Sequence, residues 1–169
     1  MEHPACSICP MSTLDGLPAH PLLVHFIVVL APLAAVLAIL CAVWPAARQR
    51  LVWLVLALAG VNLVLTPVAT EAGEWLYERT PDSPYLDTHE HLGETMIYVS
   101  IALMVAAVLL AFSHVRSNRG KSSTALSVIV AVLVVVIGVG TTVQVFRIGH
   151  SGAQSVWSDV LEPAAGEGS

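Results

Sequence analysis

Histidine stands out in this sequence, because seven histidines occur in a chain of 169 residues of which only 11% are charged. A neutral imidazole nitrogen is a common ligand of haem iron, zinc and copper, and its ring titrates near neutral pH. One histidine, His114, lies near those ends of the apolar segments that are next to most of the basic residues. The other six lie near the opposite ends: His3, His20, His25, His89, His91 and His150. This distribution predicts a histidine-rich site at one end of the protein.

Binding of haem b is one chemistry that such a site supports. Two imidazoles on facing helices bind iron from the two sides of a porphyrin while apolar side chains cover its faces. We expect His25 as one axial ligand and His89 or His150 as the other, with an arginine pairing with the propionates. The candidate haem-binding residues are His20, His25, His89, His150 and Arg147. A protein of this kind would be an electron carrier or binding protein rather than a stand-alone enzyme.

A site for a divalent transition metal is the competing prediction. Imidazole and carboxylate groups together make a mixed nitrogen and oxygen shell that suits zinc, copper or iron. The candidate ligands are His20, His25, Glu71, Glu74, His89, His91, Glu94 and His150. A simpler alternative stays open, in which the histidines only bond to loops or lie at the membrane interface. A structural role within a larger membrane complex is also open.

The remaining motifs are less specific. Cys6 and Cys9 form a CxxC that predicts a small disulfide in the amino-terminal tail, a redox pair or half of a metal site. Cys41 lies within an apolar segment and is expected to pack there. The chain has no GxSxG, P-loop, GxGxxG or HExxH motif, which argues against hydrolase and nucleotide-dependent functions.

The elements that must position these residues follow from composition. With 56% hydrophobic residues and a mean hydropathy of +0.79, the chain does not match a soluble domain, a disordered segment or a coiled coil. Four stretches approach the ~20 apolar residues that a membrane span needs. They are residues 22–43, 51–69, 96–112 and 125–145. We therefore predict an all-α, multi-pass membrane protein whose four transmembrane helices form a bundle over residues 21–146, between tails at 1–20 and 147–169.

Orientation follows from the basic residues, because Lys and Arg of short loops stay on the cytoplasmic side. Five of the seven lie in the first and third connections, whereas all twelve acidic residues lie in the tails and the second connection. Both termini and the histidine-rich end should then be extracytoplasmic. The lipid bilayer is the expected partner, together with a membrane redox complex or a second copy of the chain. The acidic balance argues against binding of nucleic acid.

Polar residues add detail to this picture. Glu71, Glu74 and Glu78 share one helical face, which predicts that the second helix continues out of the membrane. Ser83 followed by Pro84 predicts the start of a helix outside the membrane that carries His89 and His91. Within the spans, polar side chains should face protein rather than lipid. These side chains are Asn62, Thr66, Thr141 and Gln144.

Four blocks of the chain resemble a family of small bacterial membrane proteins known as domain of unknown function 2231. The opening block GLPAHPLLVHF, residues 16–26, is the most specific of them. The other three are EAGEWL at 71–76, SPYLDTHEHLGE at 83–94 and VFRIGHSGAQSVW at 145–157.

The resemblance implies a four-helix domain in the bacterial cytoplasmic membrane. It also implies recurrent polar positions at His20, His25, Glu74, His89, Glu94, Arg147 and His150. His91 departs from the family pattern, which makes His89 the better ligand candidate. Ile27 stands where many relatives have proline, and the CxxC is outside the pattern.

Overall fold

The computed structural model describes residues 13–14, 17–80, 84–120 and 123–161. Five α-helices follow in chain order: α1 (Ala19–Val43), α2 (Pro45–Tyr77), α3 (Pro84–Glu94), α4 (Met96–Asn118) and α5 (Thr124–Leu161). A two-residue antiparallel pair, β1 (Thr13–Leu14) and β2 (Leu17–Pro18), precedes α1. The fold is therefore all-α, as predicted. Cys6, Cys9 and Ser83 lie outside the described residues.

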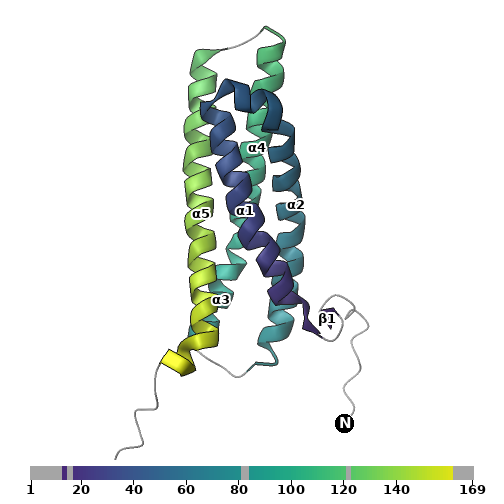
Figure 1. The fold of residues 1–169 in the computed structure, drawn as a ribbon, viewed down its shortest axis with the longest axis vertical. Helices are drawn as coiled ribbons and strands as arrows, with labels where there is room; N and C mark the ends of the chain where they lie inside the picture. The colour runs from purple at the N-terminus through teal and green to yellow at the C-terminus, as the bar shows by residue number, and fades with distance from the viewer. Residues whose placement is uncertain (1–12, 15–16, 81–83, 121–122, 162–169) are drawn as a thin grey trace, which may run out of the picture.

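Four of the helices are long and apolar enough to cross a membrane, when α3 and α4 are counted as one element from residue 84 to 118. They stand side by side, α1 between α2 and α5, and α4 also between α2 and α5 (Figure 1). The end of α1, the start of α2, the end of α4 and the start of α5 lie at one end of the bundle. The start of α1, the end of α2, all of α3 and the end of α5 lie at the other, which we call the open end.

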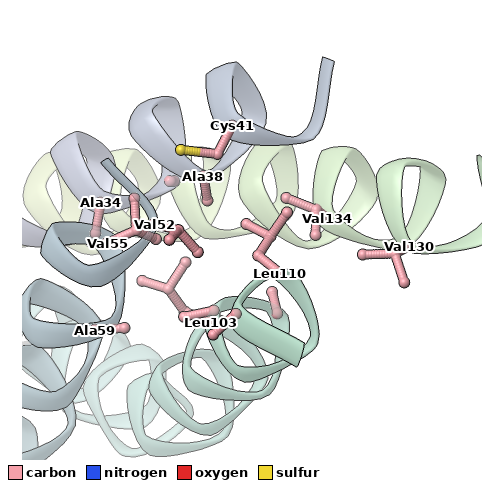
Figure 2. Packing of buried hydrophobic residues seen from close by; sticks show 14 residues of the cluster. Ala34, Ala38, Cys41, Val52, Val55, Ala59, Leu103, Leu110, Val130 and Val134 are labelled. Atoms are coloured by element: carbon pink, nitrogen blue, oxygen red, sulfur yellow. The ribbon is translucent and has the colours of Figure 1, made fainter. Parts of the chain in front are cut away.

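Small side chains let the helices approach closely in the half of the bundle far from the open end. The buried cluster there joins alanines to a few larger groups such as Val55, Leu103, Leu110 and Val134 (Figure 2). A Cβ on Gly138 of α5 would lie 2.8 Å from the end of the Ile39 side chain of α1, so a larger residue there would require this side chain to shift. Helices in lipid associate through dense packing of small residues, because the hydrophobic effect does not favour helix association inside a bilayer. Cys41 is buried in this cluster, as expected.

The helices run beyond the predicted spans at the open end. α2 continues through the acidic face to Tyr77, which confirms that the second helix extends past the apolar stretch. α3 begins at Pro84, where the missing N–H of proline costs nothing. α5 continues to Leu161, sixteen residues past the predicted end of its span at 145. Apolar content determines a span, but a helix continues until a residue breaks it, and the next proline after 145 is Pro163.

A polar network links α2 to α4 in the interior. Asn62, Thr66 and Ser100 are each no more than 1% exposed. The side-chain amide of Asn62 donates to Ser100 Oγ at 3.0 Å, and the hydroxyls of Ser100 and Thr66 lie 2.8 Å apart. Thr66 Oγ1 donates to the main-chain carbonyl of Asn62 at 2.8 Å. Asn62 and Thr66 therefore face protein, as predicted, and so does Thr141, which is 1% exposed.

A candidate haem or metal pocket

The open end contains a pocket of about 950 Å³ between α1, α2, α3 and α5. This volume is within the range of roughly 300–1,000 Å³ typical of ligand and cofactor pockets. Apolar side chains form much of its wall, among them Val24, Ile27, Leu76, Met96 and Val145. The pocket thus combines an apolar wall with the polar residues that extend above the spans.

Three of the predicted histidines line this pocket: His20 and His25 from α1, and His89 from α3. The rings of His20 and His89 lie edge to face with their centroids 6.1 Å apart. The two residues are 69 positions apart in sequence, and the fold brings them together because the start of α1 and all of α3 lie at the open end. His25 is exposed, and its Nδ1 bonds to the carbonyl of Pro21 one turn earlier.

Each of the two paired rings bonds to the backbone of a neighbouring helix. His20 Nδ1 lies 2.8 Å from the carbonyl oxygen of Ala69 in α2. His89 Nδ1 lies 3.1 Å from the carbonyl oxygen of Ile148 in α5 and 3.2 Å from Ser151 Oγ. Because a carbonyl oxygen only accepts, Nδ1 of each ring must carry the proton and donate it. In a neutral ring, Nε2 then holds a lone pair, which is the state that binds a metal.

The surroundings of His89 favour this neutral state. α3 carries Asp87, His89, Glu90, His91 and Glu94 among its eleven residues, so it lies outside the apolar span that follows. Burial in the pocket wall, and then the nearby charge of His20, lower the pKa of His89 below its ordinary value, although the bond to Ile148 acts in the opposite direction. A neutral imidazole at this position is therefore favoured at neutral pH.

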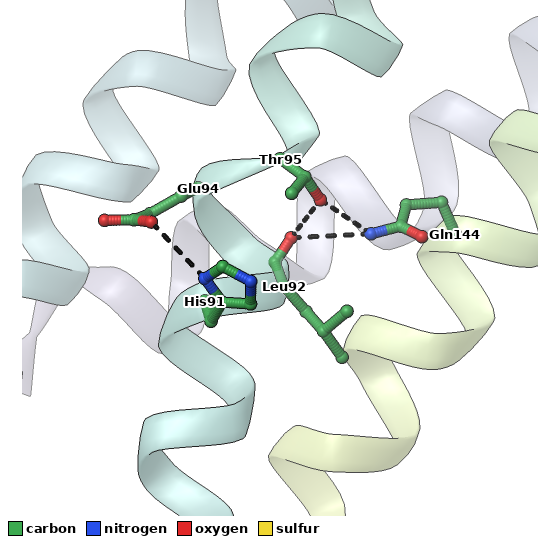
Figure 3. Close-up of polar contacts among 5 residues, drawn as sticks. All are labelled: His91, Leu92, Glu94, Thr95 and Gln144. Atoms are coloured by element: carbon green, nitrogen blue, oxygen red, sulfur yellow. Dashed lines mark hydrogen bonds and ion pairs between the residues drawn. The ribbon is translucent and has the colours of Figure 1, made fainter.

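Carboxylates are the only charged side chains among the described residues that line the pocket. They belong to Glu74 of α2 and to Glu90 and Glu94 of α3. Glu94 also lies 3.9 Å from Nδ1 of His91, at a pair that is largely exposed (Figure 3). No Lys or Arg belongs to the described lining.

Four predicted site residues lie outside this pocket. His91 is exposed on the other side of α3. Glu71 and Arg147 are exposed and do not belong to the described lining. His150 stacks on Phe146 with 6.1 Å between centroids and lines a smaller groove between α1 and α5. In the described part of the chain, no three His, Cys, Asp or Glu side chains are grouped so as to hold a metal ion.

Other residues that shape the pocket were not predicted. Glu90 lines it, and Gly73 and Gly152 allow the paired rings to approach α2 and α5. Glycine within a helix costs about 1 kcal/mol relative to alanine, so a helical glycine often has a packing reason. The two glycines were visible in the sequence, as Gly73 in EAGEWL and Gly152 in HSGAQ.

Gln144 and Thr95 fix the junction between α3 and α4. Gln144 Nε2 of α5 donates to Thr95 Oγ1 at 2.7 Å and lies 3.5 Å from the Leu92 carbonyl (Figure 3). Thr95 Oγ1 donates to the same carbonyl at 2.6 Å. The contact confirms that Gln144 faces protein. It holds α3, and with it His89, against α5.

The chain matches a known protein family. Residues 16–164 match the model of a family described as "Predicted membrane protein (DUF2231)". No curated protein and no solved structure matches the chain.

Proposed function

Since the chain belongs to the DUF2231 family of predicted membrane proteins, we propose that it is a membrane electron carrier that binds haem b through His20 and His89. The observation that carries this proposal is the pairing of the two rings 6.1 Å apart, each with Nδ1 bonded to a helix carbonyl. The proposal modifies the ligand pair expected from sequence, in which His25 took the place of His20.

The closeness of the two rings supports a shared iron. Their centroids are 6.1 Å apart, so both imidazoles would be near enough to contribute a nitrogen to the same iron. Haem also needs only two protein ligands, because the porphyrin supplies four nitrogens. A pair of histidines without a third grouped ligand suits that need.

The iron would supply one-electron chemistry, taking one electron from a reductant and passing it to an acceptor. The residues of the chain would do the rest. His20 and His89 would hold the iron, and Ile27, Met96 and Val145 would exclude water from the porphyrin faces. Burial of the site and the identity of its axial ligands would then determine the reduction potential.

The open end is proposed to face the extracytoplasmic side. Arg48 and Arg50 belong to the first turns of α2, and Arg116 and Arg119 to the end of α4. These helix ends lie opposite the open end. Basic residues in short loops favour the cytoplasm, which leaves the pocket outside. An electron partner in the same membrane or at its outer surface would then have access to it.

Single substitutions test the ligand assignment. Protein expressed with sufficient haem should show about one low-spin haem per chain, and His20→Ala or His89→Ala should abolish the low-spin spectrum. His91→Ala and His150→Ala are matched controls outside the pocket and should leave haem content unchanged. Retention of low-spin haem by both His20→Ala and His89→Ala would refute the assignment, and its loss in His25→Ala alone would return the ligand role to His25.

Binding of a divalent transition metal is a second candidate, favoured by one observation. The charged groups of the described pocket lining are all carboxylates, at Glu74, Glu90 and Glu94. Such a lining attracts a cation and repels the propionates of haem. If purified protein lacks haem but carries near-stoichiometric zinc, copper or iron that is lost in His20→Ala, this function replaces the haem proposal.

A further inference from the structure

Gly73 and Gly152 occupy equivalent places beside the two paired histidines. A Cβ built on Gly73 would lie 2.8 Å from Cε1 and 2.9 Å from Nδ1 of His20. A Cβ built on Gly152 would lie 3.0 Å from Cε1 and 3.2 Å from Nδ1 of His89. Ordinary side-chain contacts lie at 3.4–4 Å, so each imidazole occupies space that any other residue at these positions would fill.

The same spacing relates each glycine to the carbonyl that its histidine contacts. His20 bonds to Ala69, four residues before Gly73, and His89 bonds to Ile148, four residues before Gly152. In an α-helix, the N–H of residue i points at the carbonyl of residue i−4. The imidazole therefore lies against one turn of the helix. The carbonyl at the start of this turn accepts from both the imidazole Nδ1 and the N–H of the glycine at its end, and the ring also contacts that glycine. A carbonyl oxygen has two lone pairs, so the Ala69 oxygen accepts both bonds, whereas the Ile148 oxygen shares its lone pairs among the Gly152 N–H, His89 Nδ1 and the Ser151 hydroxyl.

Two separate helix pairs thus contain the same arrangement. The histidine of α1 lies on α2, and the histidine of α3 lies on α5. Ser151 adds to the second copy, because its hydroxyl donates to Ile148 at 3.0 Å and so leaves its oxygen free to accept from His89. One such contact would be unremarkable packing. Two such contacts, however, position two rings whose centroids are only 6.1 Å apart in the same part of the pocket.

We infer that Gly73 and Gly152 are positioning residues that hold His20 and His89 in the Nδ1–H form, so that Nε2 of each ring keeps the lone pair with which an imidazole binds a metal. The role of the two glycines in metal binding rests on the proposed haem site. The positions and tautomers of the two rings do not, because they are expected in the protein even when no cofactor is bound. Residues that orient a metal-binding histidine typically change metal affinity by about 10- to 100-fold when altered.

The two substitutions Gly73→Ala and Gly152→Ala should differ in strength. The Gly73 methyl would force the His20 ring to move by about 0.6 Å to reach ordinary contact at 3.4 Å, which stretches its 2.8 Å bond to Ala69. At Gly152 the needed movement is smaller, because the closest approach is 3.0 Å. Gly60→Ala on α2 and Gly140→Ala on α5 are matched controls, since a Cβ at either position meets nothing within 4 Å.

The first readout is independent of any cofactor. Nitrogen-15 NMR of histidine-labelled, cofactor-free protein in detergent distinguishes a protonated ring nitrogen from one with a lone pair, and His20→Gln and His89→Gln variants assign the signals. We expect the Nδ1–H form for both rings, a change at His20 alone in Gly73→Ala and at His89 alone in Gly152→Ala. An Nε2–H form in the unmodified protein, or equal spectra for Gly73→Ala and Gly60→Ala, would overturn the inference.

The second readout is haem affinity measured by spectral titration of the same proteins. Gly73→Ala should weaken binding by about 10-fold or more and Gly152→Ala by less, with both controls unchanged. Haem affinities in Gly73→Ala and Gly152→Ala equal to those of their controls would contradict the positioning role. If the unmodified protein binds no haem while the NMR result is as expected, the haem proposal fails, and the positioning of the two rings still stands.

Discussion

Removal of the Ser100 hydroxyl is the sharpest test of how α2 and α4 are held together. This hydroxyl accepts from the Asn62 amide at 3.0 Å and lies 2.8 Å from Thr66 Oγ1, at a site where Asn62 and Ser100 are fully buried. Ser100→Ala leaves the amide nitrogen unpaired, beside an Asn62 Oδ1 that already has no partner among the described residues. The whole side-chain amide of Asn62 would then be buried without a hydrogen bond.

The magnitude follows from two bounds. A buried polar group that loses its partner costs about 1–3 kcal/mol. Side-chain hydrogen bonds inside membrane proteins average about 0.6 kcal/mol and reach about 1.7 kcal/mol in double-mutant cycles. We therefore expect Ser100→Ala to lower the free energy of unfolding by about 1–2 kcal/mol, because it affects two contacts at once.

A double-mutant cycle separates this network from simple loss of packing. In an Asn62→Ala background no amide remains to be left unpaired, so Ser100→Ala should cost less than in the original protein by about 0.6–1.7 kcal/mol. Unfolding equilibria in mixed detergent micelles provide the measurement. Ser113→Ala, the same chemical change at a buried position of α4 outside this network, is the control. Additive costs in the cycle, or equal costs for Ser100→Ala and Ser113→Ala, would refute the reasoning.

Three further outcomes are expected. The pKa of His89 is lower in the folded protein than in the unfolded chain, so as pH falls below about 6.5 the unfolded chain takes up the proton at a higher pH than the folded protein does. The free energy of unfolding should therefore decrease as the pH drops below about 6.5. His89→Gln should weaken this pH dependence, as measured by unfolding equilibria at several pH values. Gln144→Leu should cost about 1 kcal/mol in the same unfolding assay, since it removes the bond to Thr95, and no change would contradict a role at the α3–α4 junction. With the native cysteines replaced by serine, Glu78→Cys should react with an impermeant thiol reagent in intact cells and Arg119→Cys only after permeabilisation, and the opposite pattern would reverse the proposed orientation.

The number and place of the membrane helices could be predicted from sequence, because a span needs only apolar length. The ends of the helices could not, since α5 continues through a polar segment that carries no breaker before Pro163. Pro84 was a usable signal for the start of α3, because proline at the first position of a helix is a local property.

The histidine-rich end was predictable, but the pairing within it was not. His20 and His25 lie near each other in α1, yet their Nδ1 atoms bond to different partners, the carbonyl of Ala69 and that of Pro21. Which of them meets His89 depends on how α1 and α3 are rotated about their axes, and tertiary packing determines that rotation. His150 illustrates the same limit, since its ring stacks on Phe146 of its own helix instead of lining the larger pocket.

The most direct test of the central proposal is the visible difference spectrum, dithionite-reduced minus air-oxidised, of purified protein expressed with sufficient haem. The proposal predicts sharp α and Soret bands at about one haem per chain, and their loss in a variant that lacks both His20 and His89. A featureless spectrum from folded protein supplied with haem would contradict it.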